Sequence, residues 1–147
     1  MPSWRQQALI DAPVQEVWSY VGDPARFPEW AHNVITVTGL AEVEEGAEFR
    51  QTTRTPVGKT EETTFRIEEL DDLHEIKLRC TKSGYYSRWV LTDAQSSTFA
   101  DVEIGIDPTA LQYRVFFGAL GKRYLRRIAE QTIDGLRSAL RGSRTTA

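Results

Sequence analysis

The hydrophobic pattern has a period of two over most of the chain and of three to four at its C-terminal end. Apolar and polar positions alternate in separate stretches, many of them followed by turn residues such as Pro, Gly or Asp. Alternation of this kind predicts antiparallel strands with one buried face. The expected strands are residues 3–10, 33–40, 48–55, 60–70, 74–81, 85–92 and 98–106.

Two short helices are expected between the first and second strands. Asp11 is a candidate N-cap, Pro13 suits the first turn, and Gly22 suits the stop of a helix whose apolar stripe begins at Val14. Residues 23–24, Asp-Pro, repeat the start signal, and a further Pro at position 28 is expected to end the second helix. The pair should form a bent element directly after the first strand.

A long helix is expected at residues 111–141, where apolar positions recur every three or four residues and most arginines lie off the apolar stripe. Gly118 and Gly121 predict a kink, break or irregular stretch in its first part. No linker or internal repeat divides the chain, so we expect one domain at residues 1–141 and a flexible tail at residues 142–147.

The order of elements predicts an α+β fold. A sheet with one apolar face needs a cover, and the C-terminal helix is the only predicted element long enough to provide it. We therefore expect a strongly curved, seven-stranded antiparallel sheet wrapped around that helix, with the two short helices closing one end. A curved sheet does not pack flat against a cylinder, so this arrangement can leave a cavity.

Composition and charge narrow the class of protein. The 147 residues are 40% hydrophobic and 27% charged, which is an ordinary globular profile, and no apolar run reaches the length of a membrane span. A single cysteine, Cys80, and no signal-peptide core favour a cytoplasmic protein. Residues 111–147 carry 8 basic and 2 acidic residues, although the net charge of the chain is -3. No nucleic-acid-binding motif accompanies them, so an exposed helix face is the simplest interpretation.

The stretch IDAPVQEVWSYVGDPARFPEW, residues 10–30, resembles the N-terminal signature of the START-like (SRPBCC) superfamily, in its polyketide cyclase/dehydrase branch. The signature falls on Ile10, Ala12, Pro13, Val17, Trp18, Asp23, Phe27, Pro28 and Trp30. The resemblance extends over the whole chain in the order of its elements. It implies a helix-grip fold with a deep hydrophobic pocket.

Relatives in this superfamily bind lipids, sterols, hormones, polyketides and other apolar molecules, and some catalyse cyclisation, aromatisation or dehydration. The resemblance therefore implies a hydrophobic small molecule as partner and does not choose between binding and catalysis. Only Phe27 and Trp30, within the matched motif, carry over as expected wall residues near the pocket mouth.

The alternation pattern supplies the other candidate pocket residues. Aromatic side chains share the predicted inner face with a few polar ones, as in small-molecule sites, although the same aromatics would also suit a filled core. The expected ligand-binding residues are Phe27, Trp30, Phe49, Gln51, Thr53, Phe65, Leu78, Tyr85, Trp89, Phe117, Leu120 and Tyr124. Gln51 and Tyr124 are expected to orient the ligand.

Catalytic residues cannot be assigned from the sequence. His32, His74 and Cys80 do not form a metal-ligand pattern, so we expect no metal and no cofactor. Glu61 and the tyrosines remain candidates for acid–base chemistry without an identified partner. Two alternatives to simple binding stay open: a polyketide cyclase, aromatase or dehydratase that uses the same pocket, and a protein-interaction module built on the basic helix. The interaction module predicts a filled core and an exposed Phe116 beside Arg114. The oligomeric state, a homodimer included, is also open.

Overall fold

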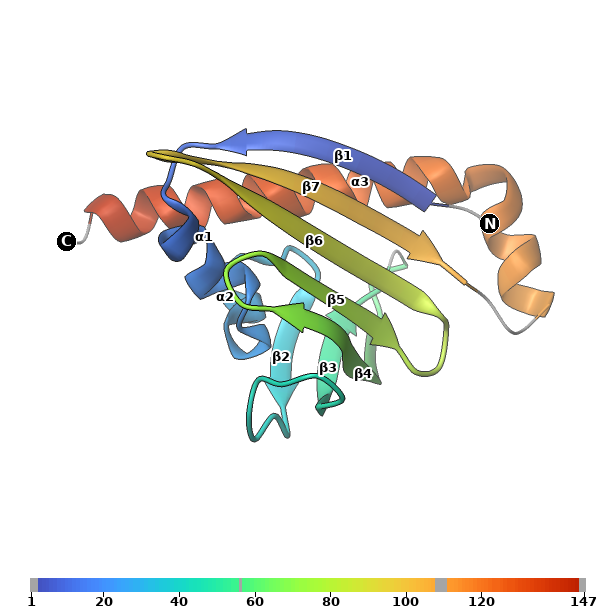
Figure 1. The fold of residues 1–147 in the computed structure, drawn as a ribbon. Helices are drawn as coiled ribbons and strands as arrows, with labels where there is room; N and C mark the ends of the chain where they lie inside the picture. The colour runs from blue at the N-terminus through green and yellow to red at the C-terminus, as the bar shows by residue number, and fades with distance from the viewer. Residues whose placement is uncertain (1–2, 56, 108–110, 146–147) are drawn as a thin grey trace.

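A curved antiparallel sheet and one long helix make up most of the molecule (Figure 1). The structure is a computed structural model that describes the backbone of residues 3–55, 57–107 and 111–145, and their side chains apart from those of 111–120 and 143–145. The strands are β1 (Ser3–Ile10), β2 (Val34–Thr38), β3 (Glu48–Arg54), β4 (Thr60–Asp71), β5 (Glu75–Cys80), β6 (Tyr85–Ala94) and β7 (Ser97–Ile106). The helices are α1 (Val14–Val21), the 3-10 turn η1 (Pro24–Arg26), α2 (Phe27–Trp30) and α3 (Leu111–Thr145).

The seven strands of the described residues form one sheet in the order β1-β7-β6-β5-β4-β3-β2, with every neighbouring pair antiparallel. The first and last strands of the alternating region therefore lie side by side, and β2 forms the opposite edge. The alternation places the predicted faces correctly, because the residues at every second position of β5 and β7 are buried. The predicted α+β helix-grip fold is confirmed.

The boundaries of the short helices differ from the sequence-based expectation. Asp11 does not cap α1; Pro13 occupies the N-cap position with extended backbone, and no side chain caps the helix. Pro28 lies inside the first turn of α2 and does not end the helix, because proline at that position displaces no helical hydrogen bond. The start signal at residues 23–24 is confirmed, since the Asp23 carboxylate accepts a hydrogen bond from the Ala25 N–H at 3.1 Å.

Gly22 follows α1 for a steric reason. Its φ of -85° lies outside the left-handed region, so the stop does not use the conformational freedom of glycine. The indole of Trp18 lies against it instead, and a Cβ at position 22 would meet the ring at 2.3 Å. The bend between α1 and η1 thus depends on a glycine that leaves room for a tryptophan.

The long helix α3 packs on only part of the sheet. It contacts β1 and β7, and also α1 and α2, while Figure 1 shows β2, β3 and β4 curling away from it. Its backbone stays helical through Gly118 and Gly121, with its first turns, in orange, running at an angle to the rest, and it extends beyond the expected end at residue 141. The concave face of β3–β6 is therefore left to the short helices and to the space described below.

A close approach between helices joins α2 to α3. Gly135 lies against the backbone carbonyl of Trp30, and a Cβ added to this glycine would meet that carbonyl oxygen at 2.1 Å. Glycine in a helix interior lowers helix stability by about 1 kcal/mol relative to alanine. The chain accepts this cost at position 135 because any side chain would push α2 away from α3.

We predict that Gly135→Ala lowers the free energy of unfolding by about 1–3 kcal/mol, since a methyl group would overpack the contact with Trp30. Gly142→Ala is the matched control on the same helix, because a Cβ there meets nothing within 4 Å. Helix propensity alone should leave that control unchanged or stabilise it by up to about 1 kcal/mol. Urea unfolding of both variants measures the difference, and equal effects at both positions would contradict the close packing of α2 on α3.

Candidate functional site

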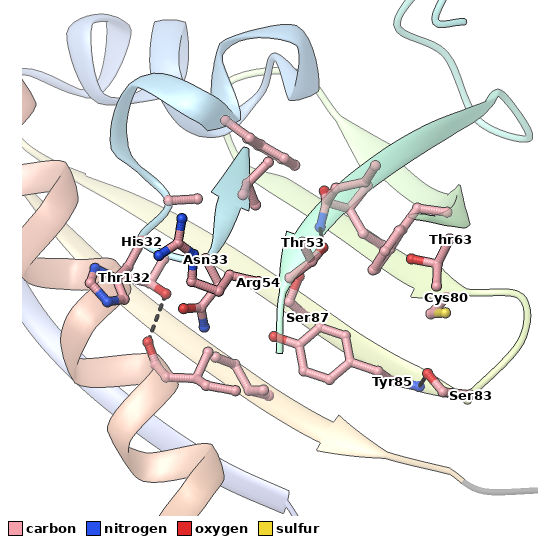
Figure 2. Close-up of a pocket in the computed structure, with 18 of the residues that line it drawn as sticks. His32, Asn33, Thr53, Arg54, Thr63, Cys80, Ser83, Tyr85, Ser87 and Thr132 are labelled. Atoms are coloured by element: carbon pink, nitrogen blue, oxygen red, sulfur yellow. Dashed lines mark hydrogen bonds between the residues drawn. The ribbon is translucent and has the colours of Figure 1, made fainter. Parts of the chain in front are cut away.

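A cavity of about 270 Å³ lies between the concave face of the sheet and α3 (Figure 2). Strands β3–β7 form its floor, the segment after α2 borders one end, and Tyr124, Ile128 and Thr132 of α3 form the opposite wall. The other described residues that line it are Val21, Phe27, Trp30, Ala31, His32, Asn33, Val34, Gln51, Thr53, Arg54, Thr55, Glu61, Thr63, Phe65, Ile76, Leu78, Cys80, Lys82, Ser83, Tyr85, Ser87, Trp89, Ile104 and Ile106.

Aromatic rings build the walls nearest the short helices. Trp30 meets Trp89 of β6 edge to face with ring centroids 5.5 Å apart, and it meets Phe27 in the same way at 5.6 Å. Its indole N–H donates a hydrogen bond to the carbonyl of Tyr20 at 3.3 Å. Edge-to-face pairs of this kind stabilise beyond the area they bury. Trp30 therefore holds α2 against the sheet and against α1 at once.

Polar groups are set into the apolar lining with unused hydrogen-bonding capacity. The Gln51 amide donates to Thr53 Oγ1 at 3.1 Å, but its carbonyl oxygen has no hydrogen-bond partner among the described residues. The Tyr85 hydroxyl likewise has none within the part of the chain that the structure describes, and Figure 2 shows it pointing into the cavity. Such groups normally find a partner when buried, so they are available to a ligand or to water.

Burial changes the acidity of the two tyrosines that face the cavity. Tyr85 lines the cavity, and removal from bulk solvent, followed by the neighbouring Tyr124 and Cys80, raises the pKa of its phenol well above the usual 10. Burial also raises the pKa of Tyr124. Both phenols are consequently neutral hydrogen-bond donors at physiological pH.

Charged side chains lie at the two ends of the cavity. His32, Asn33 and Arg54 gather at one end in Figure 2, whereas Thr63, Cys80 and Ser83 lie at the other. At that second end Lys82 forms an ion pair with Glu61 at 3.2 Å. Glu61, a candidate acid or base from the sequence, is therefore engaged by a lysine.

Nine of the residues expected to bind a ligand line the cavity: Phe27, Trp30, Gln51, Thr53, Phe65, Leu78, Tyr85, Trp89 and Tyr124. Phe49 is buried behind them, with its ring stacked on Phe65 at 5.9 Å and meeting Phe27 at 6.5 Å. Strand alternation cannot separate a ring that borders the cavity from one that supports it from behind. Phe117 and Leu120 lie outside the residues whose side chains the structure describes.

Other residues that border the cavity are outside the set expected from the sequence to bind a ligand. His32 is exposed and borders the cavity. Arg54 has the outward phase of β3, yet it sits at the end of the strand, where its guanidinium extends beside Asn33 (Figure 2). The pairing of β2 with β3 is irregular between Val34 and Thr36, close to Arg54, and the sequence pattern does not predict this irregularity.

A second hollow of about 400 Å³ lies over the outward-facing side chains of β4–β7, including Lys77, Arg79 and Arg88. Although it is larger, its charges are matched within the protein: Arg79 binds Glu68 at 2.8 Å, and Arg88 binds Glu75. Burial and a hydrogen bond to Glu103 raise the pKa of Tyr86 to about 12. This hollow is a network of ion pairs with few apolar walls, so the first cavity is the better candidate for a ligand.

Metal chemistry finds no support in the arrangement of side chains. Within residues 3–55, 57–107 and the described part of α3, no three His, Cys, Asp or Glu side chains come together in a way that would hold an ion. Cys80 is a buried free cysteine at the cavity wall.

Comparison with models of protein families shows to which family this chain belongs. The family model described as "polyketide cyclase / dehydrase and lipid transport" matches residues 1–141. The chain belongs to this family. The match confirms the relationship expected from the signature at residues 10–30, and it points to a protein that binds a hydrophobic ligand or acts as a polyketide cyclase or dehydrase. A comparison with curated protein sequences returned no match.

Solved structures share the fold of this family member at low sequence identity. TTHA0849 from Thermus thermophilus superposes with a TM-score of 0.75 at 16% identity, covering 97% of this chain and 99% of its own. A START superfamily protein from Mycobacterium smegmatis gives 0.67 at 16%, covering 96% and 95%. The di-domain ARO/CYC protein BexL from the BE-7585A biosynthetic pathway gives 0.71 at 20%, covering 94% of this chain and 49% of BexL. These likenesses establish the helix-grip architecture.

No helix of the described residues has both the length and the apolar character needed to cross a bilayer.

We predict that Tyr85→Phe makes stability less sensitive to alkaline pH. The folded protein holds the phenol protonated above the pKa of about 10 that it has in the unfolded chain, so the unfolded state loses its proton first. This stabilisation is complete below pH 10 and is lost as the pH rises toward the folded pKa. Above pH 10 the free energy of unfolding of the wild type should fall more steeply than that of the variant, by about 1.4 kcal/mol per pH unit. Urea unfolding at pH 8 and pH 11 tests this, and parallel pH profiles would show that Tyr85 is solvated.

Proposed function

We propose that the protein binds one apolar or aromatic small molecule, lipid-like or polyketide-like, in the cavity between the sheet and α3. The observation that carries the proposal is the combination of aromatic walls with polar groups that have no partner among the described residues, namely the Gln51 carbonyl and the Tyr85 hydroxyl. Small-molecule sites are mostly apolar, with a few polar groups that fix orientation. The volume of about 270 Å³ lies just below the usual range of ~300–1,000 Å³.

Each wall has a distinct part in this proposal. Phe27, Phe65 and Trp89 provide flat apolar surfaces, and stacking or edge contacts with them favour an aromatic ligand. Gln51 can accept a hydrogen bond, and Tyr85 can donate one, so a ligand with a hydroxyl or carbonyl group would be oriented between β3 and β6. Tyr124 approaches from the helix side.

We predict that Ser87→Phe abolishes binding of the neutral fluorescent probe N-phenyl-1-naphthylamine. Ser87 lines the cavity between Leu78 and Ile104 on the neighbouring strands, so a phenyl ring there would occupy the ligand space. Thr92→Phe is the matched control, because Thr92 lies exposed on the same strand opposite the outward-facing Phe99. Fluorescence titration should give saturable one-to-one binding to the wild type and the control, and binding at least about tenfold weaker to Ser87→Phe. Equal binding by all three proteins would place the probe outside the cavity.

A second candidate function is cyclisation or dehydration of a polyketide-like substrate in the same cavity. It is favoured by the neutral Tyr85 and Tyr124 phenols on facing walls, and by the structural likeness to BexL, which is described as an ARO/CYC protein. A phenol that donates a hydrogen bond to a substrate carbonyl stabilises the negative charge that develops on oxygen as an enolate forms. We assign no side chain as the base that would remove the proton when the enolate forms.

Turnover of a linear poly-β-ketone thioester would separate this function from simple binding. If Tyr85 supplies the hydrogen bond, Tyr85→Phe should lower kcat by about 10²-fold or more while N-phenyl-1-naphthylamine still binds. Unchanged turnover in the variant would remove Tyr85 from the reaction, and an inactive wild type that binds the probe would leave binding as the function.

The interaction-module alternative has less support. It predicted a filled core, whereas the described residues enclose a cavity. Its diagnostic pair, Phe116 beside Arg114, lies outside the side chains that the structure describes.

A further inference from the structure

The charges that line the cavity do not balance. Three of the described lining residues carry full charges: Arg54, Glu61 and Lys82. Glu61 and Lys82 neutralise each other through their ion pair at 3.2 Å. The Arg54 guanidinium has no ion pair and no side-chain hydrogen bond within the described part of the chain. Among the described residues that line the cavity, one positive charge is therefore left without an ion pair.

Hydrogen-bond donors lie beside Arg54, and within the described residues its guanidinium forms no ion pair with the acids of the neighbouring strand, where Glu61 lies opposite Thr53 and Glu62 opposite Thr52. Its backbone N–H donates to the carbonyl of Asn33 at 2.8 Å, which holds the end of β3 against the segment after α2. Figure 2 shows the side chains of His32, Asn33 and Arg54 at the same end of the cavity. The one lining carboxylate among the described residues, Glu61, lies on β4 opposite Thr53 and is held by Lys82. The lining cation without an ion pair in the described residues is thus the one beside His32 and Asn33.

We propose that the ligand is an apolar carboxylic acid, bound as its carboxylate with the acid group at Arg54 and the apolar body against the aromatic walls. This inference rests on the proposed function and names the class of ligand. A planar guanidinium matches a carboxylate with two parallel hydrogen bonds, and the Asn33 amide can donate another. One uncompensated charge matches a monoanion, whereas a phosphate monoester would bring a charge of about -1.5 to -2.

The position of Arg54 also orients the ligand. The arginine is exposed at the rim, so the carboxylate keeps contact with water and is not fully desolvated. The aromatic body then extends inward past Trp30 toward Trp89 and Tyr85. This arrangement requires no buried charge, which would be costly without complete pairing.

A matched pair of ligands tests the inference: 2-naphthoic acid, a carboxylate at neutral pH, and 2-naphthamide, which has nearly the same shape and no charge. The proteins are the wild type, Arg54→Gln and Arg50→Gln. Arg50 is the control, because it is exposed on the same strand, loses the same charge and does not line the cavity. Binding is measured by calorimetry or by competition with N-phenyl-1-naphthylamine.

The wild type should bind the acid more tightly than the amide, and Arg54→Gln should weaken binding of the acid by about fivefold, the scale of an exposed ion pair, with little effect on the amide. Arg50→Gln should keep the preference. In the wild type the preference should also shrink as salt rises, because the site is exposed; this measurement needs no variant.

Equal binding of acid and amide by the wild type would overturn the carboxylate inference and leave the proposed function intact. So would loss of the preference in Arg50→Gln to the same extent as in Arg54→Gln. If neither compound nor the neutral probe binds the wild type, the proposed function fails, and the inference fails with it.

Discussion

The packing of Trp30 is the interaction on which the cavity depends. Its ring meets Trp89 and Phe27, its indole N–H binds the carbonyl of Tyr20, and its own carbonyl lies against Gly135 of α3. One residue thus joins the sheet, both short helices and the long helix. Because α2 is only four residues long, it has no helical stability of its own and is held by these tertiary contacts.

The cavity follows from how the sheet is covered. The long helix packs on β1 and β7, and the short helices cover the region near β2 and β6, so part of the concave face between them is left uncovered. Apolar side chains line this gap, but they are interrupted by the Gln51 carbonyl and the Tyr85 hydroxyl, which have no hydrogen-bond partner among the described residues. The lining also contains the charged side chain of Arg54 and the ion pair between Glu61 and Lys82. An apolar interior and a polar rim suit a ligand that has an apolar body and a polar end.

The sequence predicted the strands, the long helix and nine of the described residues that line the cavity, because alternation fixes which face of a strand is buried. Phe65, Tyr85 and Trp89 were placed correctly for this reason. The same rule could not show that Phe49 supports the wall from behind, since both positions share one phase. Alternation also gives Arg54 the outward phase of β3, although its side chain borders the cavity. A two-residue period does not predict side-chain directions at the end of a strand or beside an irregular register. The Gly135 contact could not be foreseen, since it joins residues more than a hundred positions apart.

Native mass spectrometry tests the central claim, that the cavity holds one apolar molecule, most directly. The purified protein would be measured as isolated and after incubation with a mixed panel of aromatic and aliphatic acids, alcohols and amides. We expect a single adduct of one small molecule per chain, which denaturing extraction releases intact. The mass of the bare chain under both conditions would contradict the account, because the groups that line the cavity would then have no ligand to bind.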